Sequence, residues 1–131
     1  ACEKFRLIPT SVMNFVEGTR FTERKHAAFK SPYRHLLPPR PGGTSFVLSA
    51  MGGMLHSMLD VTIAYKGQTP SFWDLCCGRL GTVIVDIRRR PIDERMAAGD
   101  YAGAPAFRAR FKEWLAGVWT DKDQLLDRLG T

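Results

Sequence analysis

The sequence predicts an α/β fold in which a mixed sheet is flanked by helices. Three observations support this prediction: β-prone apolar runs recur along the chain, segments with helical periodicity lie between them, and 131 residues suffice for one compact domain. A composition of 44% hydrophobic and 24% charged residues is typical of a folded globular protein and argues against disorder. We therefore expect a single domain over residues 1–131, without internal repeats.

The N-terminal part is expected to contain a helix end and a strand. Residues 1–7 have the pattern of a helix that Pro9 ends, and residues 11–16 form a mostly apolar, β-prone run. Such a run is typical of a buried strand. The chain begins at Ala1 without a helix start signal, so we expect it to be part of a longer protein.

A long connection and a helix are expected next. Residues 21–41 are polar and basic, and a loop of this length in a compact domain is usually functional or mobile. Thr44 is expected to cap a helix over residues 45–54, with Gly52 and Gly53 at its C-terminal end.

The second half is expected to alternate strands and helices. Residues 60–65 and 82–87 predict two strands, the second stopped by Pro91, and residues 72–77 predict a short helix capped by Ser71. From about Pro105, apolar side chains recur at helical spacing and predict a core-facing stripe: Phe107, Phe111, Trp114, Leu115, Val118 and Trp119. A restart of this helix near Thr120, before Leu125, Leu126 and Leu129, is the alternative to a continuous one.

The cysteines and the hydropathy exclude several classes of protein. The three cysteines, Cys2, Cys76 and Cys77, are odd in number and lack metal-ligand spacing, which argues against a disulfide framework or a zinc site and for a reducing compartment. Cys76 and Cys77 are expected to be small core residues. No apolar run approaches the roughly 20 residues of a membrane span, so we expect any span to lie upstream.

The positive charge is concentrated in one segment. Of the formal net charge of +6, residues 18–40 carry +5, from six basic side chains against Glu23 alone: Arg20, Arg24, Lys25, Lys30, Arg34 and Arg40. This concentration suits an anionic partner such as phosphate, nucleic acid or an anionic membrane surface. A solvated basic loop explains the charge equally well.

Residues 15–22 place several phosphate-binding groups in one turn after the predicted strand. Gly18 allows a ligand to approach the backbone, Arg20 offers a planar fork of donors, and Thr19 adds a hydroxyl. Glu17 can hold Arg20 or accept a hydrogen bond from a substrate hydroxyl. The structural alternative is a Glu17–Arg20 pair that closes the turn.

These residues resemble the third conserved motif of the glycerolipid acyltransferases, usually written FPEGTR, with Val16 in place of its proline. Residues 21–26 and 36–43 are similar to the RFTEKKH and LLPRTKG segments of the subgroup that contains lysophosphatidic acid and lysocardiolipin acyltransferases and bacterial inner-membrane homologues. Residues 60–65 resemble the strand of the fourth motif without its prolines. The resemblance implies a partial acyltransferase domain, with the motifs in residues 1–65 and a C-terminal strand and helices in residues 66–131.

The resemblance also implies roles and partners. Arg20 would bind the phosphate of a lysophosphatidic-acid-like acceptor, Glu17, Gly18 and Thr19 would shape the site, and Arg40 would make a second phosphate contact. The acyl donor would be acyl-CoA or acyl carrier protein, with no metal or other cofactor. The intact protein would associate with the cytoplasmic face of a membrane, in bacteria the inner membrane, and nucleic acid would not be its partner.

The catalytic residues of the family are not expected in this chain. Its chemistry uses a histidine followed, after four residues, by an aspartate. None of His26, His35 and His56 has an aspartate at that position, and His56 and Asp60 are one residue too close, which favours structural roles for both. We expect the chain alone to be inactive in acyl transfer. The alternatives are a non-catalytic basic module that binds phospholipid or nucleic acid, and association of two copies through an unpaired sheet edge.

Overall fold

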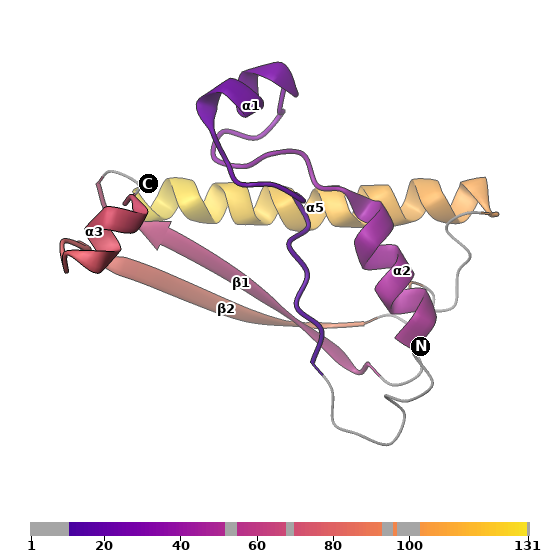
Figure 1. Ribbon diagram of the computed structural model, residues 1–131. Helices are drawn as coiled ribbons and strands as arrows, with labels where there is room; N and C mark the ends of the chain where they lie inside the picture. The colour runs from indigo at the N-terminus through magenta and orange to yellow at the C-terminus, as the bar shows by residue number, and fades with distance from the viewer. Residues whose placement is uncertain (1–10, 52–54, 68–69, 93–95, 97–102, 131) are drawn as a thin grey trace.

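The chain folds into helices around a long β-hairpin (Figure 1). The computed structural model describes residues 11–51, 55–67, 70–92, 96 and 103–130. The described elements are α1 (Glu23–Ala28), α2 (Pro41–Met51), β1 (Ser57–Tyr65), α3 (Phe72–Cys76), β2 (Val83–Pro91) and α5 (Pro105–Leu129). Helices packed with a sheet confirm the α/β class. The helix predicted over residues 1–7, together with Gly52 and Gly53, lies outside the described residues.

The described sheet consists of β1 and β2, which pair antiparallel. Both strands confirm the predicted ones and extend beyond them, because the pairing continues from Tyr65 opposite Val83 to Ser57 opposite Pro91. Pro91 is tolerated at the last position of the strand, where its missing N–H interrupts no further pairing.

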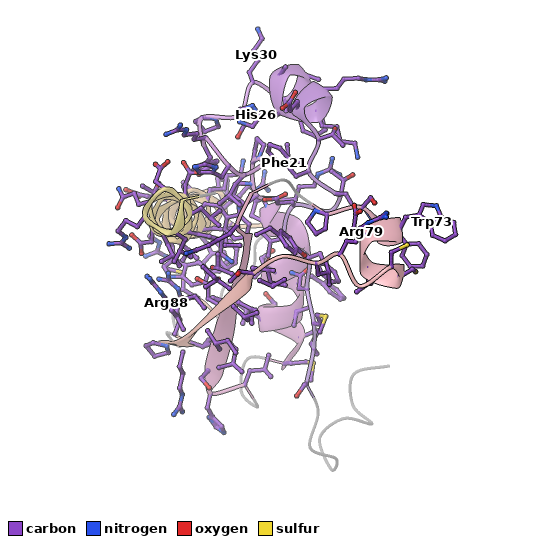
Figure 2. The ribbon with its side chains drawn as sticks, turned by 90° about the vertical axis from the view of Figure 1, so that its left-hand side faces the viewer. Phe21, His26, Lys30, Trp73, Arg79 and Arg88 are labelled. Carbon is purple, nitrogen blue, oxygen red and sulfur yellow. The ribbon has the colours of Figure 1, made fainter. Side chains whose placement is uncertain are left out.

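The two faces of this sheet differ in what covers them. Because side chains alternate between the faces, one face carries five aliphatic side chains that are 44–63% exposed: Leu59, Val61, Ile63, Val85 and Ile87. The opposite face lies toward α5 and buries Asp60, Thr62 and Ala64. Figure 2 views the molecule almost along α5, with α3 on the other side of the picture. The helix therefore covers the polar face and leaves the apolar one open.

One continuous helix, α5, supplies most of the core. It begins at Pro105, a favoured first helical residue, and ends at Gly130, whose φ of 72° is the left-handed conformation of a helix C-cap. Its buried side chains confirm the predicted stripe: Phe107, Phe111, Leu115, Val118, Trp119, Leu125 and Leu126, with Trp114 partly buried. The alternative of a restart at Thr120 is wrong, because α5 runs without a break from Pro105 to Leu129. The Thr120 hydroxyl does not cap a new helix but donates to the Ala116 carbonyl at 3.0 Å.

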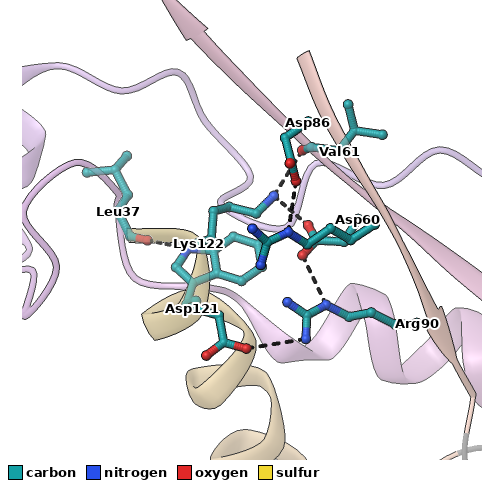
Figure 3. A network of polar contacts seen from close by, with 9 residues as sticks. Leu37, Asp60, Val61, Asp86, Arg90, Asp121 and Lys122 are labelled. Atoms are coloured by element: carbon teal, nitrogen blue, oxygen red, sulfur yellow. Dashed lines mark hydrogen bonds and ion pairs between the residues drawn. The ribbon is translucent and has the colours of Figure 1, made fainter. Parts of the chain in front are cut away.

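A buried aspartate joins α5 to both strands (Figure 3). The Asp60 carboxylate, whose side chain is 7% exposed, accepts from Arg90 Nε on β2 at 3.1 Å and pairs with Lys122 Nζ on α5 at 2.6 Å. Lys122 also donates to the Val61 carbonyl at 2.9 Å, and Arg90 reaches Asp121 at 3.4 Å. The predicted structural role of Asp60 is confirmed, while His56 is exposed.

The strand predicted over residues 11–16 does not form. Met13 and Phe15 are 83% and 79% exposed, and the segment runs beside α2 and the residues before it. Its contacts are with that region: Asn14 Nδ2 donates to Thr44 Oγ1 at 2.8 Å, and the Val16 carbonyl accepts from the Arg40 backbone. The prediction is wrong because an apolar β-prone run becomes a strand only when another strand pairs with it, and this segment instead bonds to α2 and to the residue before it.

The predicted loop over residues 21–41 contains a helix, and the next helix starts earlier than expected. Thr22 caps α1 by accepting from the Lys25 N–H at 3.2 Å, a local signal that the basic composition obscured. α2 begins at Pro41, so Thr44 lies buried inside it and does not cap it. Proline at the first helical position explains the earlier start.

The short helix α3 confirms its prediction in detail, except for the cysteines that follow it. Ser71 and Asp74 form a reciprocal capping box at its N-terminus. Cys76 and Cys77 are exposed, so their expected place in the core is wrong. No residue of α3 is buried, because the helix lies in the connection between the strands and not against α5. Among the described helices, none is long and apolar enough to cross a membrane.

Candidate functional site

The predicted phosphate-binding residues lie in a tight turn centred on Gly18. Gly18 has a φ of +68°, a conformation that favours glycine, and its N–H donates to the Phe15 carbonyl at 2.9 Å. The turn directs the exposed Arg20 away from the core. Within the described part of the chain, no hydrogen bond or ion pair occupies the Arg20 guanidinium, which leaves its donors available to a ligand.

Arg40, twenty residues further on, lies against this turn. Its backbone N–H donates to the Val16 carbonyl at 2.8 Å, which holds the two segments side by side. Its side chain packs on Gly18 so closely that a Cβ added there would lie 3.2 Å from Arg40 Cδ. The guanidinium carbon is 6.0 Å from the centre of the Phe29 ring, a cation–π arrangement. The structure thus brings together Gly18 and Arg40 from the predicted site.

A third cation, Lys25, was not singled out from the sequence. Its ammonium donates to Thr19 Oγ1 at 2.6 Å and to the Arg20 carbonyl at 3.3 Å, so it lies over the turn. The signal that could have found it is the N-cap residue Thr22, because the helix that Thr22 starts folds Lys25 back toward Thr19. The arrangement of Arg20, Lys25 and Arg40 around one glycine turn has the chemistry of an anion site.

Glu17 supports the turn and does not pair with Arg20. Its carboxylate accepts the Leu37 N–H at 3.2 Å, and no ion pair links it to Arg20, so the predicted alternative of a Glu–Arg pair is wrong. Burial raises the pKa of the Glu17 carboxyl above its ordinary 4.5, although the Leu37 N–H and the charge of Lys122 oppose the rise. Glu17 therefore fixes the segment before Arg40 relative to the glycine turn.

The raised pKa of Glu17 has a measurable effect on stability. The folded state binds the Glu17 proton more tightly than the unfolded state, so the free energy of unfolding falls as the pH rises from the ordinary pKa of 4.5 through the folded one. The variant Glu17→Gln keeps an oxygen that can accept the Leu37 N–H but carries no charge. We expect it to be at least as stable as the parent at about pH 7, with the difference vanishing at about pH 4.

Urea unfolding of the parent and of Glu17→Gln at both pH values measures this difference in stability. Glu23→Gln, on the exposed first turn of α1, is the control for losing one negative charge. A lower midpoint for Glu17→Gln than for the parent at about pH 7 contradicts the assignment.

Acidic residues near the end of α5 hold the segment that delivers Arg40. The Asp123 carboxylate accepts the backbone N–H groups of Arg34 and His35, each at 2.8 Å. Asp127 pairs with the side chains of the same two residues, and the hydrogen bond from His35 is the main cause that lowers the pKa of its carboxyl below 3.8. Trp119 Nε1 adds a bond to the Leu37 carbonyl at 3.1 Å. Arg34 is therefore used structurally and not held free for a ligand.

The three histidines have different surroundings, and none lies beside an aspartate at the family spacing. His26 Nε2 is 2.6 Å from the Tyr33 carbonyl, and its ring lies 5.6 Å from that of Phe21. His35 contacts Asp127, as described above, and His56 is exposed. Within the described residues, no group of three or more His, Cys, Asp or Glu side chains could hold a metal ion.

An open pocket of about 500 Å³ lies elsewhere, between α5 and the end of β2. It is lined by cations and acids in equal number, Arg90 and Arg110 against Glu113 and Asp121, and contains none of the five predicted site residues. Mixed charge makes it a poorer place for a phosphate than the glycine turn.

Comparisons with known proteins find acyltransferases. The chain is 27% identical over 130 residues to the 2-acyl-1-lysophosphatidylinositol acyltransferase of Saccharomyces cerevisiae, an alignment covering 92% of this chain and 33% of that protein. It is 29% identical over 120 residues to the 1-acyl-sn-glycerol-3-phosphate acyltransferase gamma of Mus musculus, an alignment covering 85% of this chain and 30% of that protein. It is 28% identical to the protein of the same name from Homo sapiens. No family model and no solved structure matches the chain.

The chain thus spans about a third of the length of these relatives. Its homologues over most of its length are acyltransferases that, by name, act on a lysophospholipid or an acylglycerol phosphate, which confirms the resemblance at that level. The relatives come from yeast and mammals, so the bacterial subgroup stays a prediction.

Proposed function

We propose that this chain forms the acceptor-phosphate site of a membrane-associated acyltransferase. The reaction moves a fatty acyl group from acyl-CoA or acyl carrier protein to the free hydroxyl of a lysophosphatidic-acid-like acceptor at the cytoplasmic face of a membrane. Arg20 binds the phosphate, as the family resemblance implies, while Lys25 and Arg40 neutralise its remaining charge. The homology to acyltransferases with phosphate-bearing acceptors supports the proposal.

The observation that carries the proposal is the convergence of cations on one glycine turn. Lys25 is fixed by Thr19, and Arg40 is fixed by Gly18 and Phe29, so two charges are positioned before any ligand arrives. Arg20 keeps its donors free in the described structure. A site organised in this way loses little side-chain entropy when a phosphate binds.

The chain's own residues bind and orient the acceptor and do not perform the bond exchange. In the reaction, the acceptor hydroxyl attacks the thioester carbonyl, the C–S bond breaks, the thiol leaves and a base takes the hydroxyl proton. His26 and His35 are engaged by Tyr33 and Asp127, and the exposed His56 has Val61 where the family spacing needs an aspartate. We therefore assign to this chain the placement of the acceptor and no role in proton transfer.

Replacing Arg20 by glutamine is expected to weaken binding of glycerol 3-phosphate, a soluble probe of the acceptor head, by about tenfold. Losing one exposed charge-assisted hydrogen bond removes about 1.5 kcal/mol of binding free energy, which corresponds to that change in Kd. Isothermal titration calorimetry with the 131-residue chain measures the effect.

The matched control is Arg24→Gln, which removes one charge from the same basic segment on the exposed surface of α1. Equal losses of affinity for glycerol 3-phosphate in the two variants would show that the basic segment attracts the phosphate without a specific site. A steep dependence of affinity on salt, together with tighter binding of DNA than of glycerol 3-phosphate, would instead favour the nucleic-acid alternative.

A further inference from the structure

The short helix α3 displays apolar side chains that the fold does not use. Phe72, Trp73 and Leu75 are 74%, 70% and 55% exposed. The helix lies in the connection from β1 to β2, and Figure 2 shows Trp73 projecting outward on the side of the picture opposite α5. Since no residue of α3 is buried, packing does not account for two aromatic rings and a leucine at these positions.

This apolar display is held in an ordered turn. The Ser71–Asp74 capping box fixes the start of α3, and Gly78, with a φ of +66°, turns the chain after its end. Arg79 closes the turn from the other side, because its N–H donates to the Asp74 carbonyl at 2.8 Å and its side chain pairs with the Asp74 carboxylate at 3.3 Å. The rings of Phe72 and Trp73 are therefore presented on a defined surface.

The connection between β1 and β2 that carries these rings has a net positive charge. Lys66 and Arg79 are exposed, and the single acid, Asp74, already accepts bonds from Ser71 and Arg79. Tryptophan and phenylalanine beside lysine or arginine suit the boundary of a bilayer, where rings enter the headgroup layer and cations meet anionic lipids. Three apolar side chains are too few for a stable protein interface of about 800 Å² per partner.

We propose that α3 docks on an anionic lipid bilayer, with Phe72, Trp73 and Leu75 entering the headgroup layer and Lys66 and Arg79 meeting anionic headgroups. This surface deepens the proposed function, because the acceptor in that function is a membrane lipid. The surface shares no residue with the glycine turn, so the two proposals fail separately.

The test uses vesicles of phosphatidylglycerol and phosphatidylcholine in equal amounts, with pure phosphatidylcholine vesicles for comparison. We expect the double variant Phe72→Ala/Trp73→Ala to sediment with the mixed vesicles about tenfold more weakly than the parent, since two rings lose their burial. Its affinity for glycerol 3-phosphate should not change, whereas Arg20→Gln should weaken that affinity about tenfold and keep vesicle binding.

Two controls make the assignment specific. Phe46→Ala removes an aromatic side chain that is 69% exposed on α2, and it should leave vesicle binding unchanged. Ile63→Thr/Val85→Thr makes the open sheet face less apolar. Full vesicle binding by the α3 double variant, a larger loss in the sheet-face variant, or equal binding of the parent to both kinds of vesicle would each overturn the proposal.

Fluorescence gives an independent measurement. Trp119 is buried and Trp114 is partly buried, so Trp73 is the described tryptophan able to enter a lipid environment. Mixed vesicles should shift the emission of the parent to the blue, and Trp73→Phe should abolish the shift while retaining most of the binding. An unchanged shift in Trp73→Phe would show that α3 stays in water. Urea midpoints equal to that of the parent confirm that the exposed substitutions leave the fold intact.

Discussion

Replacing Asp60 by alanine is expected to lower the free energy of unfolding by about 3 kcal/mol, the largest effect of any single change considered for this chain. The Asp60 carboxylate is the shared partner of Arg90 and Lys122, whose side chains are 23% and 11% exposed (Figure 3). Without it, two cations face each other in a poorly hydrated place between sheet and helix. The estimate is at the low end for a broken buried ion pair because both cations keep some contact with water.

Urea unfolding followed by tryptophan fluorescence measures this loss, and Asp86→Ala is the matched control. Asp86 lies on the same face of the sheet and pairs with Arg88 at 2.9 Å, but its side chain is 32% exposed, so its removal should lower stability by less than about 1 kcal/mol. In a Lys122→Met background, Asp60→Ala should be less harmful, because one of the two stranded charges is gone. Equal effects of Asp60→Ala and Asp86→Ala would contradict the account.

Replacing Asp123 by alanine is expected to have the second largest effect, about 2 kcal/mol of unfolding free energy, and to weaken phosphate binding from a distance. The carboxylate accepts two backbone N–H groups, of Arg34 and His35, at 2.8 Å. The His35 N–H is partly buried and would be left without its partner. Since residues 34–40 lead to Arg40, loosening them should also release the Arg40 side chain from Gly18.

The nearby Asp121→Ala is the control for this prediction. Asp121 lies two residues away on α5 and is 56% exposed, with a single contact to Arg90 at 3.4 Å. The substitution Asp121→Ala should lower the free energy of unfolding by less than about 1 kcal/mol and leave the affinity for glycerol 3-phosphate unchanged. If Asp123→Ala unfolded no more readily than Asp121→Ala, or bound glycerol 3-phosphate as well as the parent, the link between α5 and the site would be wrong.

The features that the sequence predicted correctly depend on local patterns. The spacing of Phe107, Phe111 and Leu115 alone indicates a helix with one buried stripe, and Ser71 with Asp74 alone indicates a capped helix start. Such patterns involve residues that are close in the sequence, so the structure they indicate does not depend on distant parts of the chain. The two strands were predictable for the same reason, although alternation could not reveal that their apolar face stays open.

The predictions that failed depended on distant partners. The run over residues 11–16 has the composition of a strand, yet its hydrogen bonds to other segments go to the Thr44 side chain and the Arg40 backbone N–H. Cys76 and Cys77 are apolar enough for a core, but α3 lies where there is none. Amino-acid composition indicates which secondary structure a segment can adopt, but packing against the rest of the chain determines which one forms.

The candidate site also has features that local sequence patterns predict and features that depend on distant residues. The glycine turn and its neighbours Thr19 and Arg20 were predictable from residues 15–22 alone, because the positive φ of Gly18 and the donors around it are local features. Lys25 was missed because its place over Thr19 depends on α1, which composition had suggested was a loop. The Leu37 partner of Glu17 depends on bonds to α5.

The central claim is that a phosphate binds at the Gly18 turn, and an NMR titration of the labelled chain with glycerol 3-phosphate tests it most directly. The account predicts that the backbone amide signals of Gly18, Thr19 and Arg20, with that of Lys25, shift first and furthest, and that Arg20→Gln moves the titration midpoint to an about tenfold higher ligand concentration. Largest shifts around the pocket of Arg90 and Arg110, with the turn unaffected, would contradict it.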